Sequence, residues 1–148
     1  TKQAYRFCCT RATMARYYRN MGFYYLSSYN TDMAKACYTY SNIYYHTDNA
    51  DSELNYIENA LKEAKDKGVT KDDKEYDIRT MQAMFDKENV EPGPDSKTIG
   101  IVYRVGELML QDKEYALAKD CFSIVYDITN EQQLEGVLAE LDRCLKNA

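Results

Sequence analysis

The sequence predicts an all-α protein of about seven helices. Apolar residues recur every three or four positions along most of the chain, and no stretch alternates apolar and polar residues as a half-buried strand does. The 148 residues include only six glycines and two prolines, too few for the many tight turns of a β-sandwich or barrel. Hydrophobic residues make up 45% of the chain, so we expect one core and a single domain over residues 1–148.

Four helices are expected before residue 90, over about 10–28, 32–45, 48–67 and 71–88. Thr10 has the chemistry of an N-cap for the first, and the segment from Asn30 to Asp32 offers caps for the second. The second carries its apolar residues on one side, at Met33, Ala36, Cys37, Tyr40, Ile43 and Tyr44. Gly68 is a stop signal for the third. Residues 2–7 resemble the last turns of an earlier helix, and residue 1 is not Met, so we expect a piece of a longer protein.

The clearest break in the helical pattern is the segment 92–95, Pro-Gly-Pro-Asp, because two prolines around a glycine cannot continue a helix. Three more helices are expected after it, over about 96–111, 114–128 and 130–147. Asp112-Lys113 is the turn between the first two, and Asn130 is the expected cap of the last. The last helix has leucines on one side and charged residues on the other, as the closing helix of a stacked helical array requires.

Two of the expected hairpins share one residue pattern. Gly22 stands 12 residues before Ala34 and 16 before Tyr38, and Gly106 stands 12 before Ala118 and 16 before Phe122. Small residues let two helices of a hairpin approach closely, while large residues fill the space between hairpins. The pattern predicts hairpins over about 10–46 and 96–129, with a longer, degenerate hairpin over 49–89 and a capping helix over 130–147.

This pattern resembles the tetratricopeptide repeat (TPR), a helix-turn-helix unit of about 34 residues. Neither copy has the family's first Trp or its closing Pro, and the copies lie 84 residues apart, which is not a multiple of 34. The chain is also similar to the C-terminal part of bacterial TPR-containing proteins, through the segments 16–25, 91–95 and 126–129. The resemblance implies an α-solenoid of three antiparallel helix pairs, the middle one degenerate, plus a C-terminal capping helix. It implies no particular activity.

The resemblance also implies a concave binding face, lined by the first helix of each hairpin. Carried over position by position, the partner-binding residues are Arg16, Arg19, Phe23 and Leu26 in the first hairpin and Tyr103, Glu107 and Leu110 in the last. Repeats that grip a C-terminal carboxylate use Lys and Asn where this chain has Arg19 and Phe23, so that clamp is not implied. Arg16 and Arg19 could still fork onto an acidic side chain. Alternatively, they are surface residues that serve solubility.

Positive charge and tyrosine are concentrated near the N-terminus. Residues 1–47 hold six basic residues and one acidic residue, whereas residues 48–148 hold 13 basic and 23 acidic residues. Ten of the 15 tyrosines lie between Tyr5 and Tyr45. One interpretation is a basic, tyrosine-rich groove for an acidic partner. The other is two solvated faces, with the tyrosines packing helices together. The isoelectric point near 5.0 argues against nucleic acid as a partner, and no apolar run is long enough to span a membrane.

The sequence carries no recognisable catalytic, metal or cofactor motif. His46 is the single histidine and has no His or Cys at ligand spacing, so we expect neither a zinc site nor a histidine-dependent nucleophile. No glycine-rich phosphate loop occurs, and we expect no cofactor. An enzyme using carboxylates such as Glu107 with Asp120 or Asp127 would need a deep pocket around them.

Five cysteines without a CxxC motif predict free, mostly buried thiols in a reducing compartment, hence a cytoplasmic protein. We therefore expect a non-enzymatic scaffold that binds a peptide or protein partner, with acidic partners favoured by the basic region. The alternative is a structural segment of a larger solenoid, which self-associates as a homodimer through its cut N-terminal face.

Overall fold

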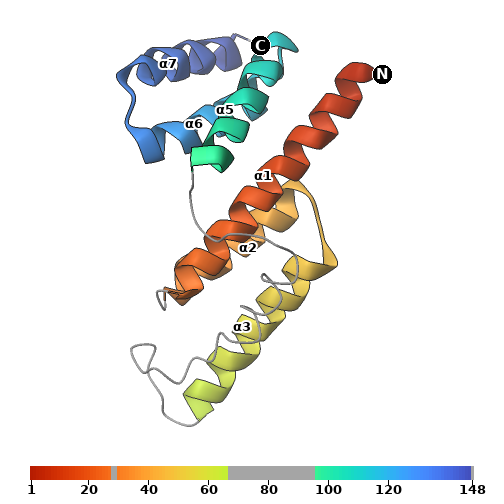
Figure 1. Ribbon diagram of the computed structural model, residues 1–148, viewed down its shortest axis with the longest axis vertical. Helices are drawn as coiled ribbons and strands as arrows, with labels where there is room; N and C mark the ends of the chain where they lie inside the picture. Colours follow the sequence, from red (N-terminus) through yellow and green to blue (C-terminus); the bar gives the residue numbers. More distant parts are fainter. Residues whose placement is uncertain (28–29, 67–95, 148) are drawn as a thin grey trace. The chain divides into compact units, whose positions relative to one another are not determined.

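In the computed structural model, the described residues (1–27, 30–66 and 96–147) form six α-helices and no strand (Figure 1). The helices are α1 (Lys2–Ser27), α2 (Thr31–Tyr44), α3 (Asp48–Asp66), α5 (Ser96–Gln111), α6 (Tyr115–Thr129) and α7 (Gln132–Lys146). The all-α prediction is confirmed. The helix expected over 71–88, the stop at Gly68 and the break over 92–95 lie outside the described residues.

Contacts divide the chain into two compact units. One unit consists of Thr1–Met14 and Pro94–Ala148, and the other of Ala15–Gly93. Helix α1 contributes its first half to one unit and its second half to the other.

Helix α1 is continuous through the position where the sequence predicted a new helix. Thr10 is not a cap, because it lies inside α1 and is only 2% exposed. The cap is Thr1, whose Oγ1 accepts a hydrogen bond from the Ala4 amide at 3.0 Å. The prediction of two separate helical segments was wrong because no proline or glycine interrupts the chain before Gly22.

Helices α1 and α2 form an antiparallel hairpin in the second unit. A Cβ atom on Gly22 would lie 2.8 Å from the ring of Tyr38, so the missing side chain is what allows this approach. Further towards the start of α1, the Ala15 carbonyl accepts a hydrogen bond from Ser41 Oγ at 2.8 Å. Asn30 caps α2, as predicted, since its side chain accepts a hydrogen bond from the Met33 amide.

Helix α3 packs on this hairpin and completes the core of the second unit. Its start is set by Thr47, whose Oγ1 accepts a hydrogen bond from the Ala50 amide at 3.1 Å. Ala50 and Ile57 of α3 are buried in one cluster with α1 and α2 residues. The buried members of that cluster are Phe23, Leu26, Ala34, Tyr38, Ala50 and Ile57.

Helices α5 and α6 form the second hairpin, in the other unit. A Cβ atom on Gly106 would lie 3.0 Å from the Cys121 Cβ and 3.3 Å from the Phe122 ring. The turn expected at Asp112-Lys113 is present. Lys113 adopts a left-handed conformation (φ 61°), and the Glu114 amide donates to the Met109 carbonyl at 2.8 Å.

Asn130 ends α6 instead of capping α7, which corrects the prediction for this residue. Its φ of 54° is left-handed, and its amide donates to the Tyr126 carbonyl at 2.8 Å. Asparagine tolerates this conformation better than most residues, which suits it to a helix C-terminus. Helix α7 then packs on α6, with Leu134 and Leu141 almost completely buried.

Candidate interaction surfaces

The seven residues predicted to bind a partner lie in different environments. Phe23 and Leu26 of α1 are 1% and 3% exposed and belong to the core that α3 completes. Arg16 is exposed. Tyr103, Glu107 and Leu110 of α5 are also exposed. The α5 residues therefore lie together on an accessible surface, whereas Phe23 and Leu26 serve helix packing.

Arg19 is engaged within the chain by a carboxylate that the sequence analysis did not consider. Its Nε lies 3.0 and 3.1 Å from the two carboxylate oxygens of Glu53 in α3, and its Nη2 lies 2.5 Å from Oε1. The Glu53 side chain is 0% exposed and that of Arg19 is 12% exposed. Because the Arg19 guanidinium is bound to Glu53 of α3, only Arg16 of the two arginines remains as a candidate to bind an acidic side chain of a partner.

The buried ion pair lies beside the aromatic ring that packs on Gly22. Burial, and then the negative charge of Glu53, raise the pKa of the Tyr38 hydroxyl far above its usual value of 10. This tyrosine is therefore neutral at physiological pH. Its role in the described part of the chain is packing, since the whole residue is 0% exposed.

The exposed face of α5 is a continuous stripe. Gly100, Tyr103, Glu107 and Leu110 follow one another at intervals of three and four residues, so they share one side of the helix. Tyr103 is 39% and Leu110 40% exposed, and a Cβ on Gly100 would meet no atom within 4 Å. The Tyr103 ring packs edge-on against Phe122 at 5.6 Å between centroids, which fixes its position. We call these four residues the α5 stripe.

Helix α2 buries a different side from the one its apolar pattern suggested. Ala34, Cys37, Tyr38 and Ser41 are buried, whereas Met33, Tyr40 and Ile43 are 43%, 50% and 62% exposed. The pattern predicted the helix correctly but not its buried side, because apolar residues lie both on the side that is buried and on the side that is exposed.

His46, Asp48 and Asp51 lie together at the start of α3, and their potential ligand atoms are all within 4.8 Å of one another. His46 Nε2 lies 2.6 Å from Asp51 Oδ2, and Asn42 Nδ2 donates to Asp51 Oδ1 at 2.9 Å. The first turn of a helix favours carboxylates and disfavours added cations. The first turn of α3 therefore explains why the two aspartates lie here, without a bound metal ion. The spacing of these residues in the sequence did not reveal the cluster.

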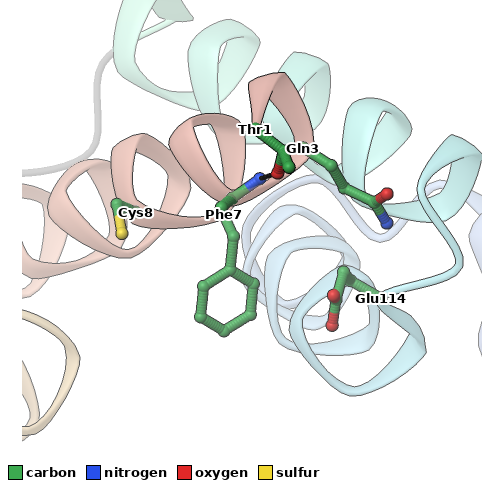
Figure 2. A pocket seen from close by; sticks show the side chains of 6 residues that line it. Thr1, Gln3, Phe7, Cys8 and Glu114 are labelled. Atoms are coloured by element: carbon green, nitrogen blue, oxygen red, sulfur yellow. Dashed lines mark hydrogen bonds between the residues drawn. The ribbon is translucent and has the colours of Figure 1, made fainter.

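An open pocket of about 430 Å³ lies along the first turns of α1 (Figure 2). Thr1, Gln3, Ala4, Phe7 and Cys8 line it together with Glu114. It holds a single carboxylate, and none of Glu107, Asp120 and Asp127 lines it. This pocket therefore does not contain the pair of carboxylates that the sequence analysis considered for an enzyme.

All five cysteines are free thiols, as predicted, but two are more accessible than expected. Cys8 and Cys9 are exposed on α1, Cys144 is half-buried, and Cys37 and Cys121 are buried. Burial raises the pKa of Cys37 to about 11 and that of Cys121 to about 12. The two buried thiols are therefore protonated at neutral pH.

No family model, curated protein or solved structure matches this chain. Within the described ranges, no helix combines the length and the apolar character needed to cross a membrane.

Proposed function

We propose that this chain is a TPR-like scaffold that binds a peptide or protein partner without catalysing a reaction. The observation that carries the proposal is the shared packing of the two hairpins. In each, a glycine of the first helix lies against the aromatic residue 16 positions later, Tyr38 in one hairpin and Phe122 in the other. Arrays of such hairpins present extended surfaces for partners.

The α5 stripe is the proposed binding face. It combines an aromatic and an aliphatic anchor, Tyr103 and Leu110, with open space above Gly100. Tyrosine is enriched among the residues that dominate binding energies at protein interfaces. Because Phe122 holds the Tyr103 ring in place, binding would cost little further ordering of that side chain.

The expected partner is a segment with an apolar anchor and at least one acidic side chain. Among the arginines of α1, Arg6 pairs with Asp112 and Arg19 pairs with Glu53. The support for an acidic partner therefore comes from the exposed Arg16 of α1 and from the exposed Lys97 and Arg104, which lie on α5 next to the stripe. Arg104 also lies 3.8 Å from Glu107 of the stripe, in an ion pair that is largely exposed to water. The exposed thiols of Cys8 and Cys9 support a reducing, cytoplasmic location.

The test is selection of peptides from a random display library, followed by fluorescence anisotropy with a selected peptide. Gly100→Gln places a long side chain over the stripe, and Gly136→Gln on α7 is the matched control. A Cβ meets no neighbour at either position. We expect Gly100→Gln to weaken binding about tenfold or more, with Gly136→Gln unchanged. Equal effects of the two substitutions, or no selected peptide that binds, would refute the proposal.

A further inference from the structure

The exposed surface of α5 repeats every seven residues. Three pairs of exposed residues have this separation, and in order around the helix they are Tyr103 and Leu110, Gly100 and Glu107, and Lys97 and Arg104. Gln111 continues the line of the basic pair, and the exposed Ile101 lies beyond it. Because an α-helix rises 1.5 Å per residue, the two members of each pair are about 10.5 Å apart along the axis.

This spacing favours a helical partner over an extended one. Side chains on one face of an extended strand recur every second residue, or about every 6.7 Å, which does not match a repeat of about 10.5 Å. Three extended residues span about 10 Å, but side chains three residues apart point to opposite faces of a strand. A helix laid alongside α5 matches the repeat at every seventh residue, as the paired helices of a coiled coil do.

The α5 stripe also has the residue order of a coiled-coil seam. Its four members are separated by three, four and three positions, which is the order of the contact residues in such a seam. Tyr103 and Leu110 are its large residues, and the Tyr103 ring is held edge-on by Phe122. A Cβ on Gly100 would meet no atom within 4 Å, so this position can receive a large side chain from a partner.

The charges beside the α5 stripe indicate the sign of the partner's charge. Lys97 and Arg104 flank the stripe, where coiled coils carry the charges that select a partner. Lys97 stands in the first turn of α5, where the helix dipole disfavours a cation, so the stability of α5 does not explain it. Glu107 offsets Arg104 only weakly, since the two groups are 3.8 Å apart and their side chains are 46% and 69% exposed. Both cations can therefore attract carboxylates of a partner.

We propose that the partner of the α5 stripe is an amphipathic α-helix that lies along α5 and carries acidic residues on its flanks. Its apolar residues recur at alternating intervals of three and four, and one of them fills the space above Gly100. Its carboxylates, seven residues apart, face Lys97 and Arg104. This inference rests on the proposed function, and it adds the conformation and the charge pattern of the partner.

The test is fluorescence anisotropy with three labelled peptides of about 21 residues, or three heptads. The first peptide has Leu at the two seam positions of every heptad and Glu on both flanks, so that copies of it repel one another. The second has one proline on the outer side of its central heptad, and the third has Lys in place of every flanking Glu. We expect the first peptide to bind, and the proline and lysine peptides to bind at least about tenfold more weakly.

Charge reversal on the protein shows whether α5 is the site. Lys97→Glu/Arg104→Glu should exchange the preference, so that the basic peptide binds more tightly than the acidic one. Lys62→Glu/Lys146→Glu is the matched control, because it changes the net charge equally through exposed lysines of α3 and α7. This control should keep the preference for the acidic peptide. Circular dichroism verifies that both variants keep their helices, and the peptide changes test the proposal without altering the protein.

Equal binding of the first and second peptides would overturn the helical partner. An exchange of preference in the control as large as in Lys97→Glu/Arg104→Glu would overturn the role of the α5 cations. If library peptides bind and are sensitive to Gly100→Gln, but the acidic helical peptide does not bind, this inference fails while the proposed function stands. If Gly100→Gln weakens no peptide of either origin, the proposed function fails and this inference fails with it.

Discussion

The guanidinium of Arg19 in α1 holds the carboxylate of Glu53 in α3, 34 residues further along the chain. Both side chains are largely withdrawn from water, at 12% and 0% exposure. Each charged group has lost most of its contact with water, and the ion pair with the other group compensates for this loss. This ion pair ties α3 to the first hairpin beside the core that Phe23 and Ile57 share.

Replacing only one member of the Arg19–Glu53 pair should lower the free energy of unfolding far more than replacing both. Arg19→Met leaves the Glu53 carboxylate buried and without its cation, and we expect a loss of about 3–5 kcal/mol in the free energy of unfolding. The double variant Arg19→Met/Glu53→Leu should recover most of this loss, because apolar side chains of similar size need no counter-charge. Urea denaturation followed by circular dichroism measures both.

The exposed pair of Glu140 and Arg143 on α7 is the control for this prediction. Water screens both of its charges, so Arg143→Met should change stability little. A loss for Arg19→Met no larger than the loss for Arg143→Met would show that the buried pair does not stabilise the packing of α3.

The ion pair of Arg6 and Asp112 should make stability depend on pH in the acid range. Arg6 Nε and Nη2 donate to the two Asp112 oxygens at 2.8 and 2.7 Å. These hydrogen bonds hold the pKa of Asp112 below its usual value of 3.8. A carboxyl with a lowered folded-state pKa stabilises the fold above its unfolded pKa, and this contribution is lost as pH falls through the folded pKa.

Asp112→Asn removes that contribution. The difference in melting temperature between wild type and Asp112→Asn should therefore be greatest above about pH 5 and shrink below about pH 4. Thermal melts across this range measure it. A difference that stays constant from neutral to acid pH would show that the ionised pair contributes nothing to stability.

Cysteine accessibility should divide the five thiols into distinct groups. Cys8 and Cys9 are exposed, whereas Cys37 and Cys121 are buried and have pKa values raised to about 11 and about 12. Iodoacetamide labelling of the native protein at about pH 8 should modify the exposed pair first, because the buried thiols are both inaccessible and protonated. The buried pair should react at comparable rates only in denaturant. Mass mapping of labelled peptides would contradict this packing if Cys121 were modified as fast as Cys8.

Local patterns predicted the helices and the hairpin contacts well. The glycine pattern placed Gly22 near Tyr38 and Gly106 near Phe122 because a hairpin brings together residues that are close in sequence. The position of Asn30 was likewise a local signal. Asn130 was predicted to cap the N-terminus of the last helix, but it ends α6. Asparagine is found at both kinds of position, because it caps N-termini and also tolerates the left-handed conformation at C-termini.

Features that depend on distant residues could not be predicted in the same way. Nothing near Arg19 in the sequence indicates that it will form an ion pair with Glu53. Likewise, nothing near Phe23 indicates that α3 will pack over its ring. The period of apolar residues predicted α2 but not its buried side, because Ala34 and Tyr38 on one side compete with Met33 and Tyr40 on the other. In the structure the side with Tyr38, which packs against Gly22, is the buried one.

The central claim is that both hairpins depend on a glycine packed against an aromatic ring, and four glycine-to-alanine variants test it most directly. Gly22→Ala forces a Cβ to 2.8 Å from a fully buried ring, and we expect a loss of about 1–3 kcal/mol in the free energy of unfolding. Gly106→Ala, at 3.0 Å from its nearest neighbour, should lose less.

Gly100→Ala and Gly136→Ala have open space and should gain about 0.5–1 kcal/mol from the higher helix propensity of alanine. Equilibrium urea denaturation of all four variants gives the values. A loss at Gly22 and a smaller loss at Gly106, with gains at Gly100 and Gly136, is the predicted result. A gain at all four positions would contradict the shared packing of the two hairpins.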